Sequence, residues 1–100
     1  MYGTVARYRV KPGMEQRFME LGPEFEAHAP PGFVALYVYR LDTNPNEYYL
    51  TVVFESKEAY FANANSPEQD AFYHKYRALL EEDPEWHDGE VVFASTAKSG

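Results

Sequence analysis

The chain has 100 residues, of which 45% are hydrophobic, 17% are aromatic and 25% are charged, and its net charge is −7. This length corresponds to a single domain, residues 1–100, and the acidic balance argues against nucleic acid, whose phosphates require clustered Lys and Arg. There is no cysteine for a disulfide or a thiolate site, and no apolar run approaches the length of a membrane span. We therefore expect a globular cytoplasmic protein with neither a membrane nor a nucleic acid as partner.

The first third of the chain predicts a strand followed by a helix. The strand runs from Tyr2 to Val10 and ends at Lys11-Pro12-Gly13. Apolar residues then recur at the three- and four-residue steps of one helix face, namely Met14, Phe18, Leu21, Phe25 and Ala29. We expect a helix from Met14 to about Ala29, with a kink or a break at Gly22-Pro23, because proline removes a backbone hydrogen bond.

The middle of the chain predicts a hairpin of two strands, Phe33 to Leu41 and Glu47 to Glu55, around a turn rich in Asn, Asp and Pro. Neither strand alternates apolar with polar residues. In the first strand, for example, Tyr37 lies on one face and the neighbouring Leu36 and Val38 lie on the other. A hairpin with two apolar faces needs a separate partner for each face.

The rest of the chain predicts two helices and a strand. Ser56 is placed to cap a short helix that ends near Ala64, and Ser66-Pro67 begins a second helix that runs to about Glu82. A last strand is expected from Glu90 to Thr96, and the tail from Ala97 to Gly100 is expected to fray.

The order of strand, helix, strand, strand, helix and strand predicts an α+β ferredoxin-like βαββαβ fold. This fold is a four-stranded antiparallel sheet in the spatial order 4-1-3-2 with helices on one face. The other face of the hairpin then remains apolar, and a soluble monomer rarely exposes so large a patch. We therefore expect a homodimer in which two sheet faces pack together.

Short motifs in a fixed order span most of the chain: Lys11-Pro12-Gly13, Pro31-Gly32-Phe33, Tyr37-Val38-Tyr39-Arg40, Asn46-Glu47-Tyr48, Phe54-Glu55-Ser56-Lys57-Glu58-Ala59-Tyr60 and Asn65-Ser66-Pro67. Together they resemble the antibiotic biosynthesis monooxygenase (ABM) domain family of dimeric α+β barrels. The resemblance implies a small monooxygenase, an oxidoreductase that oxidises quinols or polycyclic aromatic molecules with molecular oxygen and needs no cofactor. The family also includes haem-degrading enzymes and members without a known activity.

A haem-binding or haem-degrading protein is the alternative that the resemblance leaves open. In that branch an Asn on the first strand, with a Trp and a His around the second helix, carries the chemistry. Here Ala6 stands at the position of the Asn, Asn63 stands roughly at that of the Trp, and only His74 could match the haem-ligating His. A non-catalytic dimeric module that binds a small hydrophobic ligand is a further alternative.

Oxygenation without a metal or flavin requires a substrate that can be deprotonated, a dry aromatic pocket, a base, and donors that hold an oxyanion. His74 is the candidate catalytic base because histidine titrates near neutral pH, although a solvent-facing helix histidine is the commoner explanation. The candidate substrate-binding residues are Tyr37, Tyr39, Tyr48, Asn63 and Arg7. Core and dimer packing explains the tyrosines without a ligand, helix capping explains Asn63, and an ion pair across the dimer explains Arg7.

No metal site is predicted, because His28, His74 and His87 lack the short spacing of a metal-binding pair. The family resemblance and the aromatic content make a cofactor-independent monooxygenase that acts on a small aromatic or quinol-like molecule the leading hypothesis.

Overall fold

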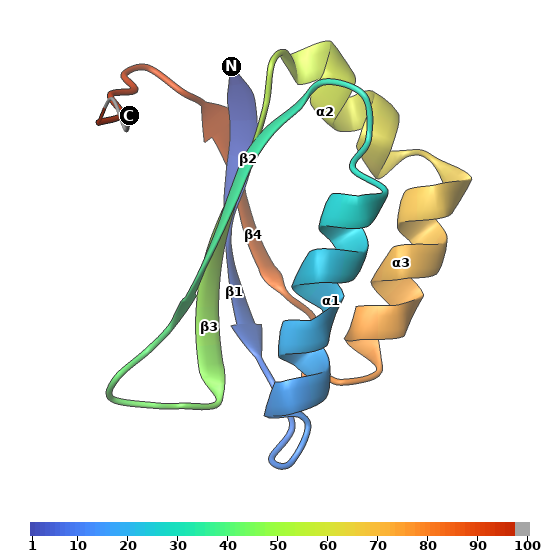
Figure 1. The fold of residues 1–100 in the computed structure, drawn as a ribbon, viewed down its shortest axis with the longest axis vertical. Coiled ribbons are helices and arrows are strands. Elements are labelled where there is room, and N and C mark those ends of the chain that lie inside the picture. The colour runs from blue at the N-terminus through green and yellow to red at the C-terminus, as the bar shows by residue number, and fades with distance from the viewer. Residues whose placement is uncertain (98–100) are drawn as a thin grey trace.

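A computed structural model describes residues 1–97 and shows one antiparallel sheet with helices packed on one of its faces (Figure 1). The elements in chain order are β1 (Tyr2–Arg9), α1 (Glu15–Ala27), β2 (Phe33–Arg40), β3 (Glu47–Phe54), α2 (Lys57–Ala64), α3 (Pro67–Arg77) and β4 (Glu85–Glu90). The spatial order β2-β3-β1-β4 is the predicted order, so the ferredoxin-like α+β fold is confirmed.

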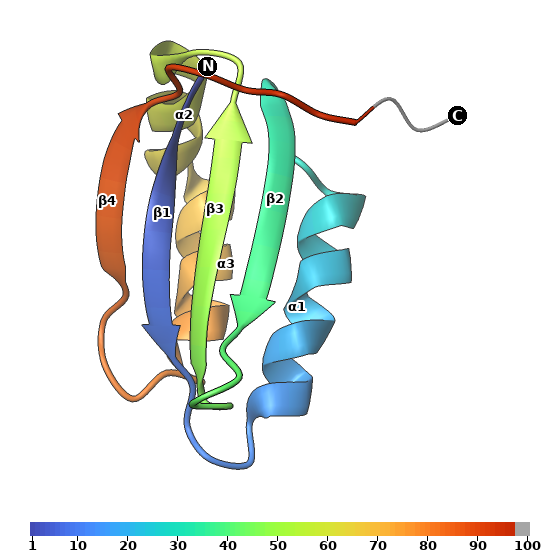
Figure 2. The ribbon, with the colours of Figure 1, turned by 90° about the vertical axis from the view of Figure 1, so that its left-hand side faces the viewer.

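Strand β1 lies in the middle of the sheet, between β3 and β4, and its side chains show which residues face the helices. It pairs with β3 from Tyr2↔Phe54 to Arg9↔Glu47 and with β4 from Tyr2↔Glu90 to Arg7↔Glu85. Because side chains alternate along a strand, the even-numbered residues of β1 face the helices and the odd-numbered residues face away. Figure 2 shows this second sheet face in front, with the helices behind it.

The core forms where the even-numbered face of the sheet meets α1 and α3. Its buried members are Ala6, Tyr8, Val10, Phe18, Leu21, Tyr48, Leu50, Tyr76 and Leu80. Helix α2 lies across one end of this layer (Figure 1). The helices therefore cover one of the two apolar faces of the hairpin and leave the other uncovered.

Serine caps begin α2 and α3 where the sequence places them. The Ser56 hydroxyl accepts the Ala59 N–H at 3.1 Å, and the Ser66 hydroxyl accepts the Gln69 N–H at 3.1 Å. Pro67 follows its cap at the first helical position, where its missing N–H removes no helical bond. The expected starts of both helices are confirmed.

Of the kink or break expected at Gly22-Pro23, the break does not occur, because α1 continues through both residues. A residue that precedes proline normally avoids helical geometry, since its Cβ and N–H meet the proline ring. Gly22 has no Cβ, which removes much of this conflict. The pair is therefore accommodated within one helix.

Helix α3 ends at Arg77 rather than near Glu82. The following residues bind to the end of β1 instead of continuing the helix. The Leu79 carbonyl accepts the Lys11 N–H at 2.8 Å, and the Glu81 N–H donates to the Arg9 carbonyl at 2.9 Å. Tertiary hydrogen bonds thus replace the last predicted helical turn.

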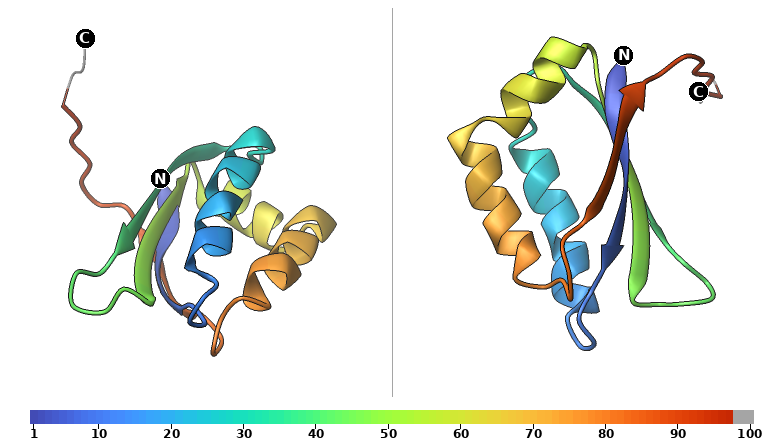
Figure 3. Two further views of the ribbon diagram at one scale, coloured as in Figure 1. Left: turned by 60° about the horizontal axis from the view of Figure 1, so that its bottom comes forward. Right: turned by 180° about the vertical axis from the view of Figure 1, so that it is seen from behind.

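The prediction of a last strand from Glu90 to Thr96 is wrong, because the strand is β4, Glu85–Glu90. Pairing with β1 decides its position. The ladder reaches Tyr2↔Glu90, and one further bond joins the Val91 N–H to the Met1 carbonyl at 2.9 Å. Beyond this point β1 offers no partner, and residues 91–97 leave the sheet (Figure 3). The expectation of a frayed tail concerns mainly residues 98–100, which lie outside the described residues.

Within residues 1–97, no helix has the length and apolar character needed to cross a membrane.

Candidate functional site

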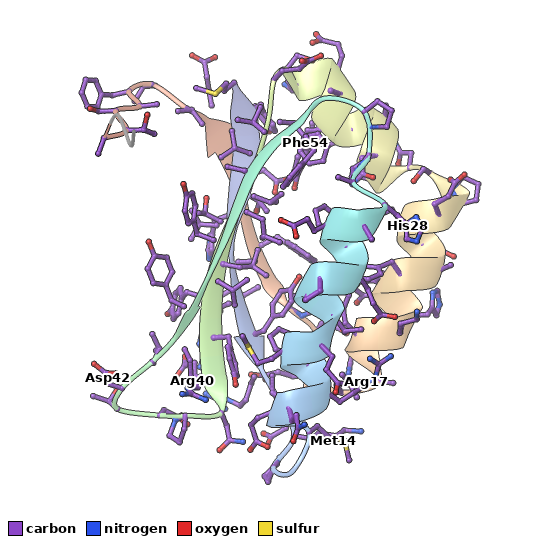
Figure 4. All side chains as sticks on the ribbon, viewed as in Figure 1. Met14, Arg17, His28, Arg40, Asp42 and Phe54 are labelled. Carbon is purple, nitrogen blue, oxygen red and sulfur yellow. The ribbon has the colours of Figure 1, made fainter. Side chains whose placement is uncertain are left out.

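A cavity of about 490 Å³ lies between the helices and the even-numbered face of the sheet. It takes lining residues from every described strand and helix, so the fold as a whole shapes it. Figure 4 shows side chains of the two layers meeting in this space, with Phe54 near α2 and with Arg40 and Asp42 at the far end of the hairpin. The volume is within the range of small-molecule sites in proteins.

Aromatic rings make up much of the wall of this cavity. The lining rings are Tyr8, Phe18, Phe25, Phe54, Tyr60, Phe61, Phe72, Tyr73, Tyr76 and Trp86. Tyr8 lies at the centre of one group, with its ring stacked on Tyr76 at 5.3 Å and edge-on to Trp86 at 5.8 Å between centroids. Walls of this kind suit a flat apolar ligand, because rings pack favourably edge to face or offset.

A smaller set of polar side chains lies among the rings. The non-phenolic members are Thr4, Asn63, Gln69, Asp70 and Asp88. The Tyr60 hydroxyl donates to Asp88 Oδ1 at 2.8 Å, and Asn63 Nδ2 lies 3.5 Å from Gln69 Oε1. The cavity therefore combines an apolar wall with a few hydrogen-bonding groups that could fix the orientation of a ligand.

Three of the lining phenols are held in the neutral form. Burial, with the neighbouring Tyr76, raises the pKa of Tyr8 well above its usual range, and burial also raises the pKa of Tyr76. Burial together with the hydrogen bond to Asp88 raises the pKa of Tyr60. Near neutral pH these hydroxyls serve as hydrogen-bond donors rather than as bases.

Of the predicted site residues, Asn63 lines the cavity. Tyr48 faces the same layer but is fully buried in the core against Phe18, with ring centroids 4.9 Å apart, and it does not line the cavity. Its hydroxyl has no hydrogen-bond partner within residues 1–97.

The other predicted site residues lie away from the cavity. Tyr37 and Tyr39 are exposed on the opposite sheet face, at 57% and 59%. Arg7 is on that face too, where it pairs with Glu47 and with Glu85 at 3.6 Å. The ion pairs of Arg7 therefore form within one chain.

His74 lies on α3 with a side chain that is 72% exposed, and its Nδ1 is 2.8 Å from the Asp70 carbonyl oxygen. It does not line the cavity, and this position gives the haem-binding alternative no support. Among residues 1–97, no three His, Cys, Asp or Glu side chains are grouped so that they could hold a metal ion.

Tyr60 and Asp88 are cavity residues that the sequence interpretation did not select. Tyr60 precedes Asn63 by three residues, so a shared helix face could have indicated it. The sequence does not indicate Asp88 as a site residue, because the last strand is expected to begin only at Glu90, two residues later. Thr4 and Tyr8 follow the even-numbered pattern of β1, which the sequence does display.

The fold and cavity define a ferredoxin-like α+β domain with an internal aromatic site. The family model described as antibiotic biosynthesis monooxygenase (ABM) matches residues 1–75. The chain therefore belongs to the antibiotic biosynthesis monooxygenase family. Comparison with curated protein sequences gave no match.

Solved structures share this fold at low sequence identity. A mutant of SnoaB, a cofactor-independent oxygenase from Streptomyces nogalater, is 21% identical with a TM-score of 0.80, over 93% of this chain and 94% of that one. A candidate antibiotic biosynthesis monooxygenase from Chloroflexus aurantiacus is 24% identical with a TM-score of 0.78, over 95% and 96%. A third, from Bordetella bronchiseptica, is 19% identical with a TM-score of 0.79, over 92% and 97%. At these identities the likeness concerns the fold.

Proposed function

We propose that this protein is a cofactor-independent monooxygenase that oxidises a small aromatic or quinol-like substrate with molecular oxygen. The aromatic cavity of about 490 Å³ is the observation that carries the proposal. Membership of the antibiotic biosynthesis monooxygenase family and the shared fold of a cofactor-independent oxygenase support it. The absence of cysteine fits the reducing cytoplasm, where we propose that the protein acts.

The chemistry of such a reaction matches what the cavity offers. A deprotonated, electron-rich aromatic substrate reacts directly with oxygen, and it must be shielded from water while it does so. The rings around Tyr8 and Tyr76 supply this shielding, and neutral phenols can donate hydrogen bonds to an oxyanion. Asn63 contributes an amide on the α2 wall. His74 lies outside the lining, so the proposal gives it no catalytic role.

We also propose that the protein is a homodimer in which the uncovered sheet faces pack together. This face carries Val5, Tyr37, Tyr39 and Tyr49, which are 38% to 59% exposed in the single chain. A contiguous apolar patch of this kind usually marks an interaction surface. Tyr37 and Tyr39 then belong to the interface, and Arg7 remains paired with Glu47 beneath it.

Oxygen uptake tests the proposed activity. The purified protein is incubated with a panel of hydroquinones and anthrones, and the oxygen concentration is followed against the same substrates in buffer. We expect uptake above the buffer rate with at least one fused-ring member of the panel. No acceleration with any member of the panel would count against the proposal.

A further inference from the structure

The α2 end of the cavity contains a carboxylate whose position is fixed from two sides. Asp88 is on β4, where it pairs with Thr4 of β1, and both residues line the cavity. Tyr60 reaches across from α2 and donates its hydroxyl hydrogen to Asp88 Oδ1 at 2.8 Å. The ring of Tyr60 is held in turn by Phe54 and Phe61, at 5.8 Å and 5.1 Å between centroids.

One oxygen of this carboxylate remains available to a ligand. Within residues 1–97, the hydrogen bond from Tyr60 is the one side-chain interaction of Asp88, and the carboxylate takes part in no ion pair. Asp70 is the other carboxylate of the lining, and it lies 3.7 Å from Nδ1 of His74 on α3. Asp88 is exposed as Asp70 is, but the hydrogen bond from Tyr60 orients its carboxylate at the sheet side of the cavity.

We propose that Asp88 anchors a hydroxyl group of the aromatic ligand and that Tyr60 is the positioning residue for this carboxylate. The inference rests on the proposed function because it uses the same cavity, and it narrows the substrate class to hydroxylated fused-ring aromatics. A hydroxyl donor gains a charge-assisted hydrogen bond to Asp88, whereas a methyl ether offers no donor and an anionic ligand is repelled.

The same hydrogen bond serves the oxidation. A phenolic hydroxyl that donates to a carboxylate releases electron density into its ring, which favours reaction with oxygen. The phenolic O–H bond breaks, its electron pair stays with the substrate oxygen, and the proton forms an O–H bond with Asp88. The electron-rich ring then reduces molecular oxygen and forms a C–O bond with it, and Asp88 returns the proton to the outer oxygen as a hydroperoxide. When the O–O bond breaks and the ring C–H proton is lost, one oxygen atom stays on the ring as a quinone carbonyl and the other leaves as water. Because its pKa is raised, Tyr60 keeps its hydroxyl proton and continues to donate it to Asp88 Oδ1.

Binding without turnover tests this assignment. Trp86 is the single tryptophan of the chain and lines the cavity, so its fluorescence reports occupation of the site. β-Naphthol and its methyl ether are titrated into the protein under nitrogen, and calorimetry provides a second measure of affinity. We expect β-naphthol to bind about 10-fold more tightly than the ether, as an additional hydrogen bond to a charged group predicts.

Variants locate the source of this preference. Asp88→Asn keeps an acceptor for Tyr60 but removes the charge, and we expect about a 10-fold loss of β-naphthol affinity with unchanged binding of the ether. Tyr60→Phe leaves the carboxylate unpositioned and should lower the preference by about 3-fold. Glu90→Gln is the matched control, because Glu90 is an exposed β4 carboxylate outside the cavity lining. It should keep the wild-type preference.

The outcomes separate this inference from the proposed activity. An Asp88→Asn variant that keeps the wild-type preference for β-naphthol over its ether overturns the assignment, as does a wild-type protein that binds neither ligand. If the preference depends on Asp88 while no substrate stimulates oxygen uptake, the anchor stands and the monooxygenase proposal fails.

Discussion

Tyr8, Tyr60 and Tyr76 hold their protons more tightly in the folded protein than in the unfolded chain, chiefly because they are buried. A raised pKa in the folded state means that their contribution to stability is complete below the unfolded value of about 10. It is lost as the pH rises from there towards the folded value. The ionisation of these cavity-lining tyrosines therefore contributes to unfolding of the protein at alkaline pH.

Spectrophotometric titration of the phenolate absorbance checks this expectation. Because Tyr60 does not ionise near pH 10 in the folded protein, Tyr60→Phe should leave the absorbance change near that pH as it is in the wild type. The difference should emerge at higher pH, where the protein unfolds. A variant that loses part of the signal at about pH 10 would contradict the account.

The sequence indicates residue types better than it indicates directions. Asn63 was selected as an amide near the join of two helices, and it lies in the cavity. His74 was selected for its chemistry, yet the lining residues on α3 are Gln69, Asp70, Phe72, Tyr73 and Tyr76, and residue 74 is not among them. The apolar stripe of this helix is therefore a better guide to the site than the titration range of one side chain.

At the scale of elements, the hairpin and the capped helices were predictable because their signals are local. Ser56 and Ser66 mark helix starts in the sequence itself, whatever packs against them. Strand β4 is different, because the polar sequence from Glu85 to Glu90 has little intrinsic preference for a strand and pairs where β1 offers partners. Asp88 was missed for the same reason.

Pro23 lowers the stability of helix α1. It lies inside α1, where proline cannot donate a hydrogen bond to the preceding turn. Pro23→Ala should therefore stabilise the protein by about 1–3 kcal/mol. Alanine is preferred to proline inside a helix, but it also gives the unfolded chain more conformational freedom, which offsets part of the gain. Urea unfolding measures the change. A variant less stable than the wild type would show that the proline is needed for the local path of α1.

At the scale of the whole molecule, the uncovered sheet face is an exposed apolar surface that carries Val5, Tyr37, Tyr39 and Tyr49. We predict that sedimentation equilibrium at micromolar concentration gives twice the monomer mass of 11.6 kDa. Replacing Tyr37 and Tyr39 together by Glu should produce monomers, because charges at the centre of an apolar interface lose their hydration. Placing Glu at exposed Gln16 and Ala62 of the helical layer is the control. A wild-type monomer would refute the dimer.

Under the proposed function, oxidation takes place in the cavity between the helices and the sheet. Val52 lines the floor of this cavity, between Leu36 and Thr4 in the sheet, so Val52→Trp should fill the space from inside. Ala62→Trp adds the same ring at an exposed α2 position outside the lining and serves as the control. Circular dichroism establishes that both variants are folded.

The most direct measurement is the rate of substrate-dependent oxygen uptake by these two variants and the wild type. We predict that Ala62→Trp matches the wild type and that Val52→Trp is slower by about 10-fold or more, since a filled site loses substrate binding. A folded Val52→Trp protein that consumes oxygen at the wild-type rate would place the reaction elsewhere and contradict the account.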